Sequence, residues 1–249
     1  MHNFFVTEDL RQGNTFAIEG TDYNHIKNVL RMQIDDTFLV SCDGVSHLCR
    51  LADFSGETVL AEIMEENYQN TELPIQIHLF QGLPKSDKME WIIQKCVELG
   101  VAEIIPVEMN RCVVKLEEKK KKSKQTRWQA IAESAAKQSK RTVIPEVSCP
   151  LSFKNAMAKA EEMDVLLIPY ENHRGMIATK EALDSIKAGQ SVGIFIGPEG
   201  GFDPAEVKAL VNINGQAVSL GSRILRTETA AITAVGMCML HMEMKETSQ

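Results

Sequence analysis

Two glycine-containing segments near the end of the chain carry the residues best suited to bind a ligand. The first, IGPEGGF at 196–202, is followed by DPAE at 203–206, a strong helix start with an aspartate cap, a proline in the first turn and a capping-box glutamate. Because this helix needs no glycine to begin, Gly200 and Gly201 are expected to shape the loop and to leave its main chain open to an incoming group. A tight corner that only the fold requires is the alternative.

The second segment, LGSRILRTETA at 220–230, places two arginines directly before a predicted helix. Glu228 suits the first turn of that helix, whereas positive charge is unfavourable there. We therefore expect Arg223 and Arg226 to do one of two things. They face an anionic substrate, or they pair as ordinary surface arginines with Glu199 or Glu228.

Both segments follow apolar runs that we predict to be strands of one sheet. From residue 75 onward, strand and helix patterns alternate, which favours a mostly parallel α/β sheet covered on both faces. Ligands of such sheets bind beyond the carboxyl ends of the strands, a position that a third loop, IPYE at 168–171, shares. Strands are expected at 75–82, 102–107, 164–170, 191–197 and 216–221, and helices at 86–100, 126–141, 153–163, 176–189, 204–213 and 227–245.

The first part of the chain has a different pattern. Up to residue 72, short β-prone runs alternate with turn signals, and one helix is expected from Asp22 to Leu30. The segment YQNTELP, which ends at Pro74, resembles a linker. We therefore predict two domains, 1–72 and 73–249, the first β-rich and acidic.

Charge is segregated along the chain. The net charge is −7, yet residues 115–141 hold ten basic residues against three glutamates. Such a block is a candidate contact for a nucleic-acid backbone, with a solvated lysine-rich loop over EEKKKKSK as the alternative. The following stretch has apolar Trp128, Ile131, Ala132 and Ala135 at helical spacing, so we expect an anchored helix with basic ends.

Several common classes of site are not indicated. The sequence has no P-loop, no G-x-G-x-x-G after a strand, no G-x-S-x-G and no H-E-x-x-H motif. The six cysteines form no C-x-x-C pair and no cluster with histidine, so we expect free thiols and no metal. No apolar run has the roughly 20 residues that span a membrane, and the N-terminus is unlike a signal peptide, so a cytoplasmic protein is expected.

Taken together, IGPEGGF and LGSRILRTETA resemble the RsmE family of SPOUT methyltransferases, which methylate small-subunit ribosomal RNA. Other family-like segments occur in the same order along nearly the whole chain: HIKNVLR, QGLPKSDKMEWIIQKCVELGV, NRCVVK, AAKQSKR and IPYE. The resemblance implies a PUA-like β-barrel that binds RNA at 1–72 and a SPOUT α/β domain at 73–249 with a C-terminal trefoil knot. It also implies a homodimer through the last helix and the knot region.

The resemblance further implies S-adenosylmethionine as cofactor and N3 of one uridine of 16S rRNA, position 1498 in conventional numbering, as the methyl acceptor. Arg226 is the first candidate, and Arg111 the second, to stabilise negative charge on the uracil, and Glu199 or Glu228 is the candidate base or else an arginine partner. The expected cofactor-binding residues are Ile168, Pro169, Ile196, Gly197, Pro198, Glu199, Gly200, Gly201, Leu220, Gly221, Ile224, Leu225 and Arg226.

Basic residues in both domains are expected to contact RNA. They are Lys27, Arg31, Lys85, Lys88, Lys119, Lys120, Lys121, Lys122, Arg127, Lys137, Lys140, Arg141 and Arg223. Lys137 departs from the family pattern, in which many relatives have glutamate, and this departure favours an RNA-facing role over a catalytic one. Three alternatives remain: a non-enzymatic RNA-binding or assembly factor, a SPOUT methyltransferase with another target such as tRNA, and a nicotinamide-dependent oxidoreductase.

Overall fold

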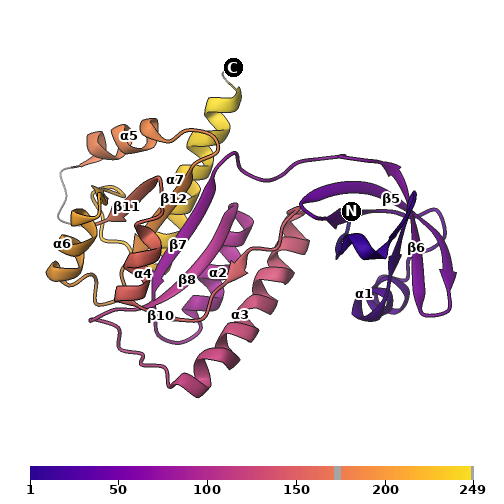
Figure 1. The fold of residues 1–249 in the computed structure, drawn as a ribbon, viewed down its shortest axis with the longest axis horizontal. Coiled ribbons are helices and arrows are strands. Elements are labelled where there is room, and N and C mark those ends of the chain that lie inside the picture. Colours follow the sequence, from indigo (N-terminus) through magenta and orange to yellow (C-terminus); the bar gives the residue numbers. More distant parts are fainter. Residues whose placement is uncertain (171–174, 248–249) are drawn as a thin grey trace. The chain divides into compact units, whose positions relative to one another are not determined.

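The computed structural model describes residues 1–170 and 175–247, which divide into two compact units. The first unit comprises residues 1–72 together with 136–144, and the second comprises residues 73–135 and 145 onward. Figure 1 follows the chain through both units. Within the described ranges, none of the helices combines the length and the apolar character needed to cross a membrane.

The first unit is built on a six-stranded sheet in the order β1-β4-β5-β6-β3-β2. Register shifts within β5 bend this strand, as β-bulges do, and its apolar side chains pack with those of its neighbours into one core. Helix α1 (Gly20–Asn24) continues into a wider turn at His25–Val29, close to the helix predicted for 22–30. The strands are β1 (Asn3–Val6), β2 (Arg11–Gln12), β3 (Thr15–Ile18), β4 (Thr37–Cys42), β5 (Val45–Ser55) and β6 (Thr58–Glu65).

A buried ion pair attaches segment 136–144 to the first unit. The Arg141 side chain is 4% exposed and binds the Glu72 carboxylate through Nε, at 2.9 Å from both oxygens, and through Nη2. The same carboxylate accepts hydrogen bonds from the backbone amides of Thr142 (2.8 Å) and Val143 (3.3 Å). Because one carboxylate accepts this many hydrogen bonds, residues 141–143 are fixed against Glu72, which lies in the YQNTELP linker.

The second unit is an α/β sheet whose paired strands are all parallel, in the order β10-β8-β7-β12-β11-β13, with β9 beside β8. Residues of the central strands are buried almost without a break, as expected for a sheet covered on both faces. The predicted α/β fold class is confirmed. The strands are β7 (Gln76–Gly82), β8 (Val101–Glu108), β9 (Glu146–Val147), β10 (Leu151–Ser152), β11 (Val165–Pro169), β12 (Ser191–Ile196) and β13 (Gln216–Val218).

The helices that begin in this unit start and end close to the predicted positions, except α3, whose last residues, 136–139, belong to the first unit. Helix α2 buries Met89, Ile92, Ile93, Cys96 and Val97, which confirms the apolar face predicted from spacing. Helix α6 has the predicted capping box between Asp203 and Glu206. The helices are α2 (Lys88–Glu98), α3 (Glu118–Ser139), α4 (Phe153–Ala160), α5 (Met176–Ser185), α6 (Pro204–Asn212) and α7 (Thr227–Thr247).

Helix α3 starts eight residues before the predicted start at residue 126, which corrects both that start and the alternative of a loop over EEKKKKSK. It begins at Glu118, so the lysine run 119–122 lies in its first turns. Lysine favours helices, and Lys121 is held by Glu118 at 2.7 Å and by Glu108 of β8 at 3.1 Å. The predicted apolar face is present, with Trp128 4% exposed.

Candidate functional site

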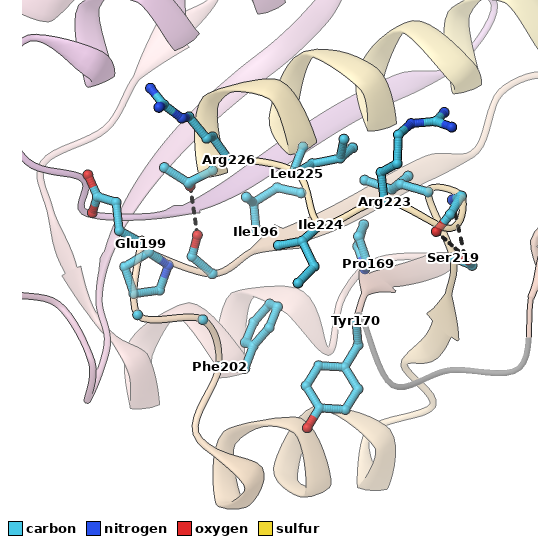
Figure 2. A pocket seen from close by; sticks show the side chains of 18 of the residues that line it. Pro169, Tyr170, Ile196, Glu199, Phe202, Ser219, Arg223, Ile224, Leu225 and Arg226 are labelled. Carbon is cyan, nitrogen blue, oxygen red and sulfur yellow. Dashed lines mark hydrogen bonds between the residues drawn. The ribbon is translucent and has the colours of Figure 1, made fainter.

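A cavity of about 480 Å³ lies where the three loops predicted from the sequence come together. Strand β11 pairs in parallel with both β12 and β13, so the carboxyl ends of the three strands meet at one edge of the sheet. The loops that leave these ends, together with the start of α7, form the wall (Figure 2). The volume is in the range usual for small-molecule sites.

Nearly all of the residues expected to bind the cofactor line this cavity. Ile168 does not: it is fully buried in β11, where it packs against Gly215, and its contact with the cofactor stays a prediction. Sequence reasoning missed Tyr170 and Phe202, whose rings meet edge to face at 6.3 Å (Figure 2). Both lie inside the quoted segments IPYE and IGPEGGF, and that membership was the available signal. Glu171, the last residue of the IPYE loop, lies outside the described residues.

The glycines of loop 196–202 make room for protein atoms. A Cβ on Gly200 would lie 3.0 Å from both Cβ and the carbonyl oxygen of Arg111, and one on Gly197 would lie 3.1 Å from Gly201 C. Among the glycines of this loop, Gly201 alone combines a positive φ, of 68°, with open space at the Cβ position. The missing side chains at Gly197 and Gly200 thus make room for neighbouring chain, and both residues also line the cavity. The expectation that the main chain at Gly200 and Gly201 is open to an incoming group stays a prediction.

The loop is also tied to the first residue of α7. The Thr227 hydroxyl donates to the Gly197 carbonyl oxygen at 2.7 Å and accepts from Gln81 Nε2 at 2.9 Å. Gln81 and Thr227 are both buried, with 0% and 6% exposure. Because a buried hydroxyl that serves two partners has one preferred position, these bonds fix loop 196–202 against the start of α7.

Glu199 and Glu228 share one cationic partner, Lys88. Its Nζ lies 3.1 Å from Oε1 of Glu199 and 3.3 Å from Oε2 of Glu228. Burial alone would raise the pKa of Glu199, but the Lys85 backbone amide, which donates at 2.9 Å, and the Lys88 ammonium hold it below its usual value. The hydrogen bond to Glu199 raises the pKa of Lys88. Of the two roles expected for Arg223 and Arg226, pairing with these glutamates is therefore taken by Lys88, which was itself expected to contact RNA.

Three arginines differ in their surroundings. Arg223 and Arg226 line the cavity and are exposed, and within the described part of the chain neither forms an ion pair. Their side chains extend away from the rings of Tyr170 and Phe202 (Figure 2). Arg111 is not part of the lining; its Nη1 donates to the Gly200 carbonyl oxygen at 3.2 Å.

The residues expected to bind RNA fall into two groups. One group is exposed: Lys27, Arg31, Lys85, Lys119, Lys120, Lys122, Arg127, Lys140 and Arg223. In the other group, Lys88 and Lys121 are engaged as described above, and Lys137 donates to Asp22 at 2.9 Å within the first unit. Arg141 is buried against Glu72, so it is withdrawn from the set that can reach a phosphate.

The lining fits a nucleoside cofactor of amphipathic character. Aliphatic Ile196, Ile224 and Leu225 supply apolar surface, and the glycine-rich loop supplies backbone donors and acceptors. Charged groups lie at the same cavity, Glu199 and Lys88 on one wall and the two exposed arginines on the segment before α7. Apolar surface for a base, backbone for its polar edge and charges for an ionic tail are the features such a ligand needs.

Two family models match the chain. The model described as an RNA methyltransferase domain matches residues 71–239, and the one described as an RNA methyltransferase PUA domain matches residues 18–64. A protein of Bacillus subtilis (strain 168) named ribosomal RNA small subunit methyltransferase E is 40% identical over 94% of this chain and 94% of its own length. One model thus matches within the first unit and the other matches most of the second.

Solved structures agree with this match. The crystal structure of a hypothetical protein superposes with a TM-score of 0.90 at 37% identity, over 97% of this chain and 99% of that one. A ribosomal RNA small subunit methyltransferase E from Neisseria gonorrhoeae, bound to S-adenosyl methionine, gives a TM-score of 0.79 at 31% identity, over 95% and 96% of the two chains. The predicted resemblance to the RsmE family is confirmed.

Proposed function

The chain belongs to the family of ribosomal RNA small subunit methyltransferases E, and from this premise we propose that it methylates N3 of one uridine, position 1498, in 16S rRNA with S-adenosylmethionine as methyl donor. The observation that carries the proposal is the cavity of about 480 Å³ enclosed by the 196–202 and 220–226 loops and by Pro169 and Tyr170 after β11. A similar chain of this family was crystallised with that cofactor.

When bound, the cofactor supplies an electrophilic methyl group, so the protein's task is to hold the acceptor nitrogen in line and to stabilise the charge that develops on it. Uracil N3 is a poor nucleophile until its proton leaves, and the resulting charge spreads onto the ring oxygens. Arg226 is the first candidate to stabilise that charge, because its guanidinium is exposed at the cavity and has no ion-pair partner within the described residues. Arg111, bound to Gly200, is proposed to hold the loop.

The position of the glutamates weakens their candidacy as general base. A base must accept a proton from N3, whereas Glu199 is held ionised by the Lys85 amide and Lys88, which lowers its proton affinity. Glu228 contacts the same ammonium. We propose that both serve mainly to hold Lys88. The N3 proton then passes to solvent water, and the positive charge of Arg226 stabilises the uracil anion that remains.

RNA contact is proposed along the first turns of α3 and at the cavity rim. Lys119, Lys120 and Lys122 are exposed on α3, and Arg223 is exposed at the cavity. Lysine side chains on one helix suit contacts to phosphates, which position RNA without reading its sequence. In the first unit, Lys27 and Arg31 are the exposed candidates for the PUA-like domain, which we propose spans residues 1–72.

Further features of the family are proposed for this chain as well. A homodimer through α7 and the knot region would place each site near a subunit boundary, and exposed Leu240 and Met244 on α7 (52% and 62%) are consistent with such a contact. A cytoplasmic location follows from a ribosomal substrate. Light scattering that gives a monomer mass at micromolar concentration would contradict the dimer.

Methyl transfer to two acceptors, small subunits and tRNA, tests the proposed function. Labelled methyl groups are expected to reach small subunits that lack the modification, with little transfer to tRNA. Label on tRNA alone would favour the alternative target, and cofactor binding without transfer to any RNA would favour an assembly factor. Binding of a nicotinamide cofactor in place of S-adenosylmethionine would favour the oxidoreductase.

A further inference from the structure

Lys88 joins two walls of the cavity that are far apart in sequence. It lies at the start of α2 and lines the cavity. Its Nζ contacts Glu199, in loop 196–202, at 3.1 Å, and Glu228, in the first turn of α7, at 3.3 Å. A single ammonium group therefore bridges the loop after β12 and helix α7, which follows loop 220–226.

The surroundings make this bridge stronger than an ordinary surface pair. The side chains of Lys88, Glu199 and Glu228 are 30%, 24% and 17% exposed, so solvent screens them only in part. The Lys85 backbone amide fixes the Glu199 carboxylate from a second side at 2.9 Å. Without the ammonium, two carboxylates would face each other with no cation between them, and the loop and α7 would repel.

We propose that Lys88 is a positioning residue of the cofactor cavity, which sets the distance between loop 196–202 and the start of α7 before the cofactor binds. The inference rests on the proposed function, since it assigns the cavity to S-adenosylmethionine. Lys88 acts through Glu199 and Glu228, and the cofactor need not touch it. Removing the ammonium is then expected to loosen both walls. The cavity should then bind every ligand with lower affinity, whatever the charge of that ligand.

Calorimetric titration with S-adenosylmethionine and with S-adenosylhomocysteine tests this role. Lys88→Met is expected to raise both dissociation constants about tenfold, which corresponds to about 1.4 kcal/mol. Lys88→Arg, which keeps the charge and the reach, is expected to restore most of the affinity. Lys95→Met is the matched control, because Lys95 lies on the same helix, is 29% exposed and pairs at 2.8 Å with Glu98, away from the cavity lining.

A double-mutant cycle separates positioning from direct contact. In a Glu199→Gln, Glu228→Gln background, Lys88→Met is expected to change the dissociation constants less than about twofold, because its partners no longer need a cation. An undiminished effect in that background, or wild-type affinity in Lys88→Met alone, would overturn the proposal. Should Lys88→Met not fold, Glu228→Gln serves instead, because it breaks one of the two ion pairs. It is expected to raise the dissociation constants of both ligands several-fold, and unchanged constants in this variant would also overturn the proposal.

Failure of this inference can be told apart from failure of the proposed function. A wild-type protein that binds neither ligand refutes the proposed function and the inference with it. A wild-type protein that binds both ligands, with Lys88→Met equal to the Lys95→Met control, refutes the positioning role alone.

Discussion

Thr227→Val tests how the first residue of α7 supports the cavity. Valine has nearly the same shape as threonine but lacks the hydroxyl, and Thr227 is 6% exposed, so the change removes two hydrogen bonds with little change in packing. The Gly197 carbonyl oxygen loses its 2.7 Å donor, whereas Gln81 Nε2 keeps its 2.9 Å bond to Gly82.

The magnitude follows from these two losses. An unsatisfied buried acceptor costs about 1–3 kcal/mol, and the loss of a bond by a donor that keeps another partner costs about 0.5–1 kcal/mol. The free energy of unfolding of the second unit is therefore expected to fall by about 2–3 kcal/mol. Affinity for S-adenosylmethionine is expected to fall as well, because loop 196–202 is no longer fixed to α7.

Urea unfolding and calorimetric titration measure the two effects on the same protein. Thr229→Val is the matched control, since Thr229 is exposed on the same turn of α7 and its change is expected to alter stability by less than about 0.5 kcal/mol. If Thr227→Val were as stable as Thr229→Val and bound the cofactor equally well, the argument that this hydroxyl holds the cavity would be refuted.

Three further predictions concern stability, catalysis and RNA. Burial alone would raise the pKa of Glu72, but the Arg141 guanidinium and two backbone amides hold this pKa below its usual value. The ion pair therefore contributes its full stability above the ordinary glutamate pKa, and this stability is lost as the pH falls through the lowered pKa of folded Glu72. Accordingly, Glu72→Gln should cost about 3 kcal/mol in urea unfolding at neutral pH and much less in acid, and an equal cost at both pH values would contradict the ion pair. Arg226→Ala should lower kcat about 100-fold while leaving cofactor affinity within a few-fold; full activity would remove its assigned role. Neutralising the lysines at 119–122 should lower the affinity for small-subunit RNA and reduce the dependence of that affinity on salt concentration. An unchanged salt dependence would mean that these lysines do not contact the RNA and are simply solvated at the end of the helix.

Local patterns in the sequence were sufficient for most of the fold. The buried face of α2 follows from apolar residues at helical spacing, and the cap of α6 follows from four adjacent residues. Alternation of strands and helices predicts a parallel sheet, and a parallel sheet places the loops after β11, β12 and β13 at one edge. The location of the cavity was therefore predictable from residues within each segment.

Partners far apart in sequence were not predictable in this way. Lys88 has two glutamate partners more than 100 residues away, and Arg141 has Glu72 as its partner, and no periodicity marks such pairs. The composition of the basic block indicated an RNA contact, yet Arg141 of this block is buried and cannot reach a phosphate. The same limit applies to Gly200, whose lack of a side chain suits Arg111. A glycine in a loop signals close approach but does not say which group approaches.

The most direct test of the proposed function identifies the product nucleoside. Small subunits that lack the modification are incubated with the protein and with S-adenosylmethionine that carries a trideuterated methyl group, and their RNA is digested and analysed by mass spectrometry. We predict 3-methyluridine with the deuterated methyl group at the target position. A deuterated methyl group on another nucleoside would contradict the account. So would the absence of any deuterated methyl group from the RNA when the protein is shown to bind S-adenosylmethionine.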